Sequence, residues 1–345
     1  MAHSRPRQGG RAVRVDDVAR VAQVSPITVS RALRTPEKVK PDTRERVLAA
    51  VASTGYVVDS IASSLRSGRS MVVTVFVASL ENPHFAAAMQ GALDAFDGSR
   101  FHLMFAQTGY SEQLSPDVVE TLLPFRPAAV MFTGVIRRED TREALRRLGV
   151  PVVEMWGDDH EPIDMLVGES GYAGGRLMGV HFGEQGFRRI AFAGYVGERG
   201  NARLEGFRDG LRSVGREVEL VAACEGTATF SGGVAAFEEI MTRLPECDAA
   251  FMGSDLLAAG AVVAARRIGV QVPDQTAVAG YGDLDFSAQI LPALTTIHVG
   301  DYEIGRRAGE MLRARIEGKT VETRSVHMPL ELIVRASTMR LEAPG

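Results

Sequence analysis

The chain has 345 residues, which is more than one ordinary hydrophobic core organises, so we expect a small unit and a large one. Hydrophobic residues make up 45% and charged residues 24%, and no run approaches the roughly 20 apolar residues of a membrane-spanning helix, which excludes a helical membrane protein. The two cysteines, Cys224 and Cys247, exclude a disulfide framework and a four-thiolate zinc site. The basic N-terminus has no apolar segment behind it, so we expect no secretory signal and a cytoplasmic location.

Charge is distributed unevenly along the chain. Residues 1–70 hold 13 of the 39 basic side chains and 6 of the 43 acidic ones, a net charge of +7. The other 275 residues therefore carry a net charge of −11. A basic N-terminal part suits contacts with nucleic-acid phosphates, whereas an acidic body repels them. A basic disordered tail is the alternative, but only the first dozen residues lack a helical pattern.

Two short helices separated by a turn are predicted from residue 15 onward. Apolar residues recur with helical spacing on both sides of an interruption at 23–25. Ser25 can cap the second helix, and Pro26 suits its first position. A third helix is predicted over 42–54, with Val47, Leu48 and Val51 facing inward and Gly55 just past its end. The second helix leaves polar and small apolar side chains exposed that can touch base edges and phosphates: Pro26, Ile27, Thr28, Ser30, Arg31 and Arg34.

This segment resembles the N-terminal domain of the LacI/GalR family of regulators. The family pattern is an Asp-Val-Ala helix, a turn, Val-Ser, two variable residues and Thr-Val-Ser-Arg. It is matched by Asp17, Val18, Ala19, Val24, Ser25, Thr28, Val29, Ser30 and Arg31. The resemblance implies that Pro26 and Ile27 read bases together with Arg31. It also places Asp17 and Ser25 among the DNA contacts. Gln23 stands where the family usually has glycine, so it must tolerate a positive φ or reshape the turn. Lys40 replaces the usual serine cap before Pro41.

The next segment, 56–70, resembles the family's hinge helix, which orders on operator DNA. Leu65 stands where the family inserts a leucine into the minor groove, and we place Ala62 beside it among the DNA contacts. Val58 and Asp59 replace the usual Pro-Asn pair, and a plain linker is the alternative. We therefore expect a basic arm over 1–14, a helix-turn-helix headpiece over 15–58 and a hinge over 59–70.

Strand-like and helix-like segments alternate from Met71 onward, which predicts parallel sheets covered by helices on both faces. The last long helix is expected over 301–316. By resemblance, residues 71–340 form a periplasmic-binding-protein-like domain of two doubly wound lobes. The first lobe comprises about 71–165 and 295–325, and the second about 166–294 and 326–340.

The resemblance also implies that a small effector binds in the cleft between the lobes. Candidate contacts follow predicted strands or match family motifs, and ligands of such folds bind at the carboxyl ends of strands. The candidates are Ser79, Asn82, Phe85, Trp156, Arg203, Ser254, Asp255, Tyr281, Gly282 and Asp283. Ser254 and Gly282 depart from the usual family residues. For Trp156, the only tryptophan, core packing is the alternative.

Motifs of enzymes are absent from the sequence. There is no GxGxxG, no GxxxxGK[ST], no GxSxG and no HExxH, and GYAGGRLMG lacks the dinucleotide spacing. The run Asp158-Asp159-His160-Glu161 could suggest a metal site, but a solvated loop is the favoured interpretation. We expect neither a cofactor nor a metal. A solute-binding protein and a sugar-modifying enzyme are the alternatives from other classes, and residues 15–55 argue against both.

These observations predict a transcriptional repressor that binds a near-palindromic operator as a homodimer, with a tetramer possible. The surroundings of Trp156 and Tyr281 are most similar to gluconate-operon repressors of the family. Sugar-binding members usually have an aspartate at the position of Gly282. Since a carboxylate there would repel an anion, its absence favours a sugar acid held by Arg203. A neutral sugar or a sugar phosphate is the alternative effector.

Overall fold

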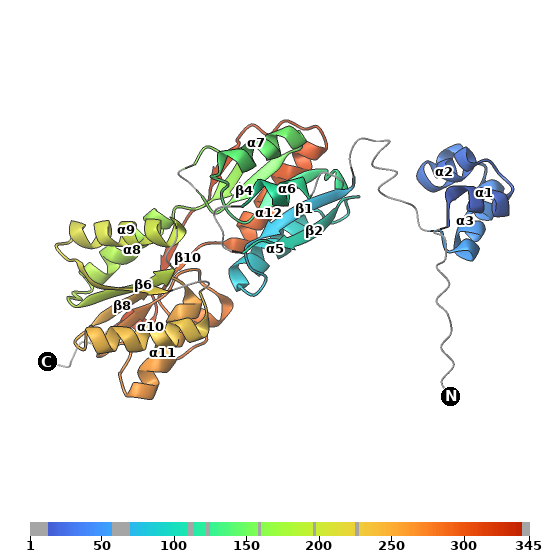
Figure 1. Ribbon diagram of the computed structural model, residues 1–345. Coiled ribbons are helices and arrows are strands. Elements are labelled where there is room, and N and C mark those ends of the chain that lie inside the picture. The colour runs from blue at the N-terminus through green and yellow to red at the C-terminus, as the bar shows by residue number, and fades with distance from the viewer. Residues whose placement is uncertain are drawn as a thin grey trace, which may run out of the picture. The chain divides into compact units, whose positions relative to one another are not determined.

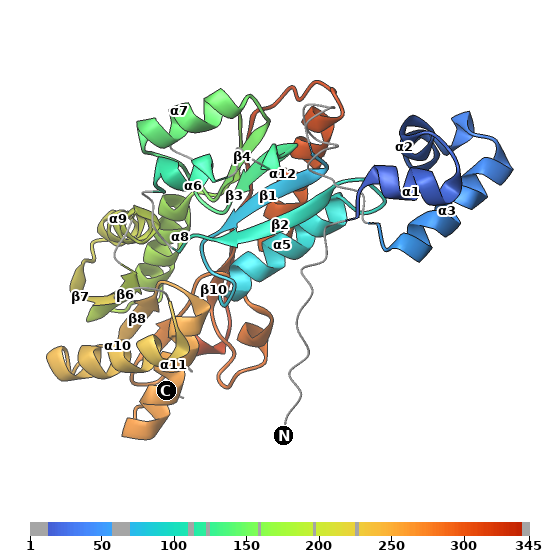
Figure 2. The ribbon, with the colours of Figure 1, turned by 45° about the vertical axis from the view of Figure 1, so that its right-hand side comes forward.

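The computed structural model describes residues 13–56, 70–109, 114–121, 125–157, 160–195, 198–224 and 228–339. The chain divides into two units, residues 1–70 and 71–345. Ribbon views of the helices and strands are given in Figure 1 and Figure 2.

The first unit is a three-helix domain with its own small core. Its elements are α1 (Val15–Ala22), α2 (Pro26–Arg34), the 3₁₀ turn η1 (Pro36–Lys38) and α3 (Pro41–Thr54). Ser25 caps α2, because its Oγ accepts the backbone N–H of Thr28 at 3.1 Å, and Pro26 occupies the first helical position, where no N–H is needed. Val18, Val29 and Val47 are fully buried, one from each helix.

Two positions in this unit depart from ordinary helix chemistry. Gln23 adopts φ 53° and ψ 48°, so of the two outcomes expected where it replaces glycine the structure has the positive φ. Lys40 makes no side-chain capping bond, and Gly55 ends α3 with φ 66°. The prediction that Leu48 faces inward is wrong: its side chain is 45% exposed, and Ala50 takes the inward position instead.

The second unit contains the remaining elements. In chain order they are β1 (Val72–Val77), α5 (Pro83–Ala95), β2 (His102–Gln107), α6 (Pro116–Glu120), β3 (Ala129–Phe132), α7 (Glu139–Leu148), β4 (Val152–Met155), β5 (Met165–Gly168), α8 (Gly171–Glu184), β6 (Ile190–Tyr195), α9 (Glu198–Ser213), β7 (Val218–Cys224), α10 (Phe230–Arg243), β8 (Ala249–Met252), α11 (Asp255–Ile268), β9 (Ala277–Ala279), η3 (Asp285–Ala288), β10 (Thr296–His298), α12 (Asp301–Ile316), β11 (Ser325–His327), β12 (Glu331–Ile333) and η4 (Ala336–Thr338).

The first lobe is built on a six-stranded sheet in the order β11-β5-β4-β3-β1-β2, with every neighbouring pair parallel. Side chains of β1 alternate between its faces. Val73, Val75 and Val77 pack in the core that α5 and α12 cover, whereas Phe76 stacks on Phe132 in the core beneath α6 and α7. Figure 2 shows these helix pairs on opposite faces of the sheet.

The second lobe is built on a four-stranded parallel sheet in the order β7-β6-β8-β9. Phe192 and Phe251 contribute to an aromatic core with Phe182 of α8 and Phe207 of α9. The other face of the sheet carries alanines such as Ala191, and α10 and α11 cover it. In Figure 1 these helix pairs lie above and below the sheet.

The chain passes between the lobes three times. It leaves the first lobe after β5, returns to it before α12 and leaves it again after β11. The strand β5 belongs to the first sheet, so the first crossing lies after Gly168, a few residues beyond the 165/166 boundary expected from the sequence. β10 pairs antiparallel with β12, so the second and third crossings lie side by side.

The strand order reverses at β1 in the first sheet and at β6 in the second. Ligands of such folds bind at the carboxyl ends of strands near these points.

Candidate effector site and DNA-binding surface

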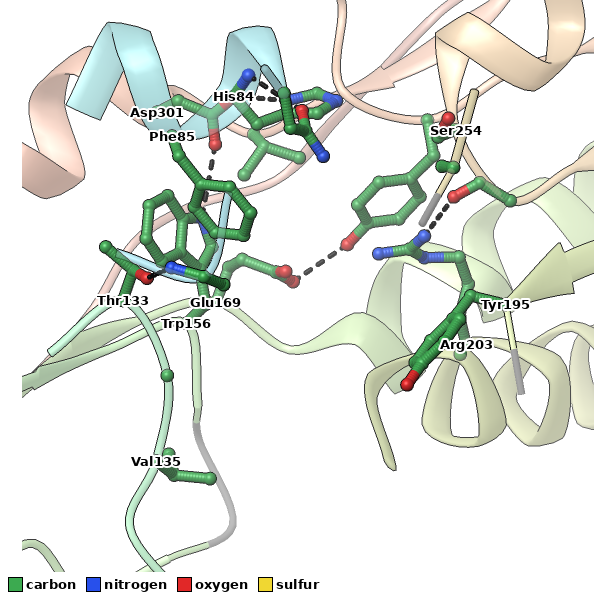
Figure 3. Close-up of a pocket in the computed structure, with 18 of the residues that line it drawn as sticks. His84, Phe85, Thr133, Val135, Trp156, Glu169, Tyr195, Arg203, Ser254 and Asp301 are labelled. Atoms are coloured by element: carbon green, nitrogen blue, oxygen red, sulfur yellow. Dashed lines mark hydrogen bonds and ion pairs between the residues drawn. The ribbon is translucent and has the colours of Figure 1, made fainter. Parts of the chain in front are cut away.

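A cavity of about 160 Å³ lies where the carboxyl ends of the two parallel sheets face each other. First-lobe residues that follow strands reach it, among them Ala78, Thr133 and Trp156, and so do Tyr195 and Ser254 of the second lobe. The amino ends of α5, α9, α11 and α12 also contribute lining residues. Figure 3 shows side chains from both lobes pointing toward one another across it.

Arg203 of α9 is the principal cation on the second-lobe side. Its Nη1 donates to the backbone carbonyl of Gly253, and its guanidinium carbon lies 3.4 Å from the centroid of the Tyr281 ring. Its Nε is buried and has no hydrogen-bond partner among the described residues. Within the same ranges, no carboxylate forms an ion pair with Arg203. The guanidinium is therefore oriented by a carbonyl and a ring while one of its donors stays unsatisfied.

The glycine-rich start of α8 explains how Arg203 and Tyr281 come together. A Cβ on Gly175 would lie 2.0 Å from the carbonyl oxygen of Arg203, and a Cβ on Gly174 would lie 2.7 Å from Cε2 of Tyr281. Only glycine permits both approaches. The segment GYAGGRLMG, which is no dinucleotide motif, thus places two cavity residues.

Tyr281 joins Arg203 to an acidic group. Its hydroxyl donates to Oε2 of the buried Glu169 at 2.8 Å. Burial and the adjacent Glu169 raise the pKa of Tyr281 well above its usual value, so the phenol stays protonated and remains a donor. Glu169 follows β5 and lines the cavity.

The first-lobe side combines an aromatic wall with a buried carboxylate. Phe85 and Trp156 meet edge to face at 5.0 Å between ring centroids. Trp156 has φ 56°, a conformation rare for a bulky residue, and its indole N–H donates to Oδ1 of Asp301 at 3.1 Å. Oδ2 of Asp301 lies 2.5 Å from Nδ1 of His84. In Figure 3 this group and Arg203 stand on opposite sides of the cavity.

Six of the ten effector-site candidates line the cavity. They are Asn82, Phe85, Trp156, Arg203, Ser254 and Tyr281. Two of them also cap helices: Asn82 accepts the N–H of His84, and Ser254 accepts the N–H of Leu257. Their contact with an effector stays a prediction.

The other four candidates lie outside the cavity lining. Ser79 is buried and its Oγ accepts the N–H of Glu81. Asp255 is fully buried, and its carboxylate accepts bonds from Leu284 N at 2.8 Å and from the hydroxyls of Ser287 and Thr296 at 2.6 Å. These bonds tie α11 to the loop after β9 and to β10, which is a structural arrangement.

Asp283 and Gly282 contact other residues of the chain instead of lining the cavity. Asp283 forms an ion pair with Arg335 at 2.8 Å and lies 3.1 Å from Nδ1 of His298, so it holds the C-terminal segment. Gly282 has φ 130°, and a Cβ there would lie 1.8 Å from Cε1 of His84. The place of a side chain at 282 is occupied by the His84 ring.

Sequence reasoning missed one imidazole and two carboxyl groups that line the cavity, those of His84, Glu169 and Asp301. Each carried a usable signal, because Glu169 directly follows a strand and the other two begin helices, where ligands of such folds bind. The strand β5, however, is only four residues long and was not recognised.

The acidic loop considered as a metal site is only partly described, because Asp158 and Asp159 lie outside the described residues. His160 Nε2 lies 2.6 Å from Arg142 Nη1 and 3.4 Å from Glu154 Oε1. In the described ranges no group of three or more His, Cys, Asp and Glu side chains could hold a metal ion.

The candidate DNA-binding surface is the outer side of α2. Ser25, Pro26 and Arg31 are exposed and Ile27 is 64% exposed, while Thr28 and Ser30 are half-buried. Asp17 differs from the others: its carboxylate accepts the N–H of Arg14 and pairs with Arg20 at 2.6 Å, so it stabilises α1. Some of these candidates and segments lie outside the described residues: the Arg34 side chain, Ala62, Leu65, residues 1–12 of the arm, and 57–69, which include all of the hinge but Ser70.

A helix-turn-helix unit followed by a two-lobed α/β unit with a cleft defines a class of ligand-binding DNA regulators. Residues 14–59 match the family described as bacterial regulatory proteins, lacI family, and residues 180–338 match the periplasmic binding protein-like domain. An HTH-type transcriptional regulator GntR from Pseudomonas aeruginosa is 33% identical over 94% of this chain and 95% of its own. The chain belongs to the LacI family. It is a DNA-binding transcriptional regulator and not an enzyme, and the family includes repressors.

Solved structures agree with this assignment. A LacI-family regulator from Silicibacter pomeroyi superposes with a TM-score of 0.88 at 29% identity, covering 95% of this chain and all of its own. A regulator CelR in complex with cellobiose has a TM-score of 0.67 at 28% identity, covering 94% of this chain and 99% of its own. In the described part of the chain, no helix is both long enough and apolar enough to span a bilayer.

Proposed function

We propose that this regulator is a repressor controlled by a sugar acid of the gluconate type, bound in the cavity between the lobes. The observation that carries the proposal is the state of Arg203, whose buried Nε has no partner among the described residues and whose charge meets no carboxylate there. A buried donor without an acceptor costs free energy, and a carboxylate is the best acceptor for a guanidinium. An acidic effector would supply what the cavity lacks.

The other cavity residues suit the rest of such a molecule. Thr133, Ser254 and Asn82 offer polar groups to hydroxyls, and the rings of Phe85 and Trp156 offer apolar surface to the carbon chain. The two acidic residues of the cavity are already engaged. Asp301 pairs with His84 and Trp156, and Glu169 accepts the Tyr281 hydroxyl. Repulsion of an effector carboxylate is therefore weakest on the Arg203 side.

A neutral sugar is the second candidate effector. The related CelR structure contains cellobiose, and the Glu169 carboxylate can accept hydrogen bonds from sugar hydroxyl groups.

Calorimetry on the full chain separates an acidic effector from a neutral one. Gluconate, a ketogluconate and 6-phosphogluconate are compared with glucose and cellobiose. We expect an acid to bind, and Arg203→Gln to weaken its binding by roughly 10- to 100-fold, which corresponds to the loss of a charge-assisted hydrogen bond. Arg212→Gln on the same helix, exposed and paired with Asp209, is the matched control. Binding of neutral sugars alone, or an unchanged affinity in Arg203→Gln, would contradict the proposal.

We further propose that the regulator binds a near-palindromic operator as a homodimer. The support is strand β2, a sheet edge on which Met104 is 39% and Phe105 37% exposed, one on each face. Exposed apolar side chains on an open sheet edge favour association with another chain. Effector binding would then alter the arrangement of the subunits and, through the hinges, the affinity for DNA.

Sedimentation of a truncation that starts at Met71 tests this association. It should dimerise and bind effector without binding operator, and Phe105→Asp should produce monomers. A monomeric wild-type chain would contradict the dimer, and retained operator binding by the truncation would contradict the assignment of DNA contact to residues 1–70. A tetramer in the same measurement would extend the proposal without removing the dimer.

A further inference from the structure

His84 is the second residue of α5 and enters the cavity from the first lobe. Its Nδ1 lies 2.5 Å from Oδ2 of Asp301, and the other oxygen of that carboxylate accepts the indole N–H of Trp156. The side chain of His84 is only 14% exposed. The imidazole is therefore held in one orientation by a carboxylate that is itself fixed.

This bond decides what the other ring nitrogen can do. Nδ1 carries a proton that it donates to Asp301, so in the neutral ring Nε2 has only a lone pair, and in the charged ring Nε2 carries a second N–H. Among the described residues, Nε2 of His84 has no hydrogen-bond partner. The ring lines the cavity, so an effector is the partner that its geometry leaves open.

Gly282 of the second lobe has no side chain and so leaves space for the His84 ring. A Cβ at 282 would lie 1.8 Å from Cε1 and 2.5 Å from Nε2 of His84, a separation that no side chain tolerates. Gly282 also has φ 130°, which disfavours any other residue. The imidazole thus reaches across from the first lobe into space that only a glycine leaves free.

We propose that His84 is a second anchor for the acidic effector, whose Nε2–H donates to an effector oxygen from the lobe opposite Arg203. This inference rests on the proposed sugar-acid function and names a further residue of the same site. Because Nε2 is a donor only in the charged ring, an acid should bind with uptake of a proton. The effector would then be held between a guanidinium and an imidazolium, one from each lobe, and its binding would draw the lobes together.

Three charged groups act electrostatically on the ring: Asp301 of α12, Asp255 of α11 and Arg203 of α9. Burial and Arg203 work against the imidazolium, but the pKa of His84 is raised, because Asp301 and Asp255 favour the charged form more strongly. The charged ring therefore dominates below this raised pKa. Affinity for an acid should be highest there and should fall as the pH rises through it.

Calorimetry with gluconate as the probe tests the inference on the full chain. Titrations in two buffers of different ionisation heat, from about pH 6 to about pH 9, give affinity and proton uptake across the titration of an imidazole. For the wild type we expect uptake of up to one proton and weaker binding at high pH. His84→Gln should bind gluconate roughly tenfold more weakly at low pH, with no proton uptake and no pH slope.

Two controls separate this role from a structural one. His327→Gln, exposed on β11, should behave as wild type. Gly282→Ala should displace the ring and weaken binding, but should add little in a chain that already carries His84→Ala, because the two residues share one contact. Unchanged affinity and proton uptake in His84→Gln would overturn the inference while leaving a gluconate site at Arg203 intact. An equal loss for glucose would also overturn it, and a wild type that binds no acid would remove both proposals.

Discussion

The guanidinium of Arg203 lies over the Tyr281 ring, with 3.4 Å between its central carbon and the ring centroid. This contact orients the guanidinium, because no carboxylate of the described residues forms an ion pair with it. Tyr281→Phe keeps the ring and removes the hydroxyl that bonds Glu169, so we expect effector affinity to change little and stability to fall by about 1–2 kcal/mol. Tyr281→Leu removes the ring and should weaken effector binding as well, by about 1 kcal/mol or more.

Calorimetry and denaturant unfolding of both variants separate the two contributions of Tyr281. If Tyr281→Leu bound effector as tightly as Tyr281→Phe, the ring would not be what positions Arg203.

Asp255 and Ser254 are neighbours whose substitutions should have different consequences. Asp255→Ala would leave three buried donors without an acceptor, from Leu284, Ser287 and Thr296, and should destabilise the second unit by roughly 3–5 kcal/mol. Ser254→Ala loses one helix-capping bond and should cost about 1 kcal/mol.

Denaturant unfolding followed by the fluorescence of Trp156, the only tryptophan, measures both losses. Similar small losses for the two variants would show that the Asp255 carboxylate is not a structural acceptor.

Asp255 also shows which features of the fold and of the site can be predicted from the sequence. Residue pattern predicted the helix-turn-helix, the alternation of strands and helices, and the helix at Asp301–Ile316, because each depends on residues close in sequence. Asp255 was placed in the cavity by its motif. Its actual partner Thr296 lies 41 residues away, on a strand of three residues that carries no pattern of its own.

The same limit applies to His84 and Gly282, which come from different lobes and meet only in the folded chain. In the sequence, Gly282 stands out for the carboxylate that it lacks, and no neighbouring residue predicts an imidazole in its place. A cavity contact between lobes is decided by tertiary packing, which no local pattern encodes.

His181 of α8 should make the second unit sensitive to acid. Its ring is buried with Nε2 2.9 Å from the Thr338 hydroxyl, and burial lowers the pKa of His181 from 6.5 to about 4. Between these values the unfolded chain takes up a proton that the folded chain does not. Stability should therefore fall as the pH decreases from about 6.5 to about 4, by about 3 kcal/mol.

Denaturant unfolding at a series of pH values measures this slope. His181→Gln should reduce it by that amount, whereas the exposed His327→Gln should not. An equal slope in wild type and His181→Gln would mean that other groups cause the acid sensitivity.

Arg31 should contribute to operator specificity more than to general affinity for DNA. Its side chain is exposed on the outer side of α2, one helical turn beyond the 64% exposed Ile27, and among the described residues it forms no ion pair. A cation on this face can reach base edges in the major groove, and such a contact discriminates between sequences by about 1–3 kcal/mol. With an operator obtained by selection in vitro, Arg31→Ala should therefore lose far more affinity for the operator than for random DNA.

Arg44 is exposed on α3, and Arg44→Ala serves as the matched comparison. Loss of a phosphate contact weakens binding to operator and to random DNA alike and reduces the salt dependence by about one unit. Arg44→Ala should therefore leave the ratio of the two affinities unchanged. Equal losses on operator and random DNA in Arg31→Ala would assign that side chain to the phosphate backbone instead.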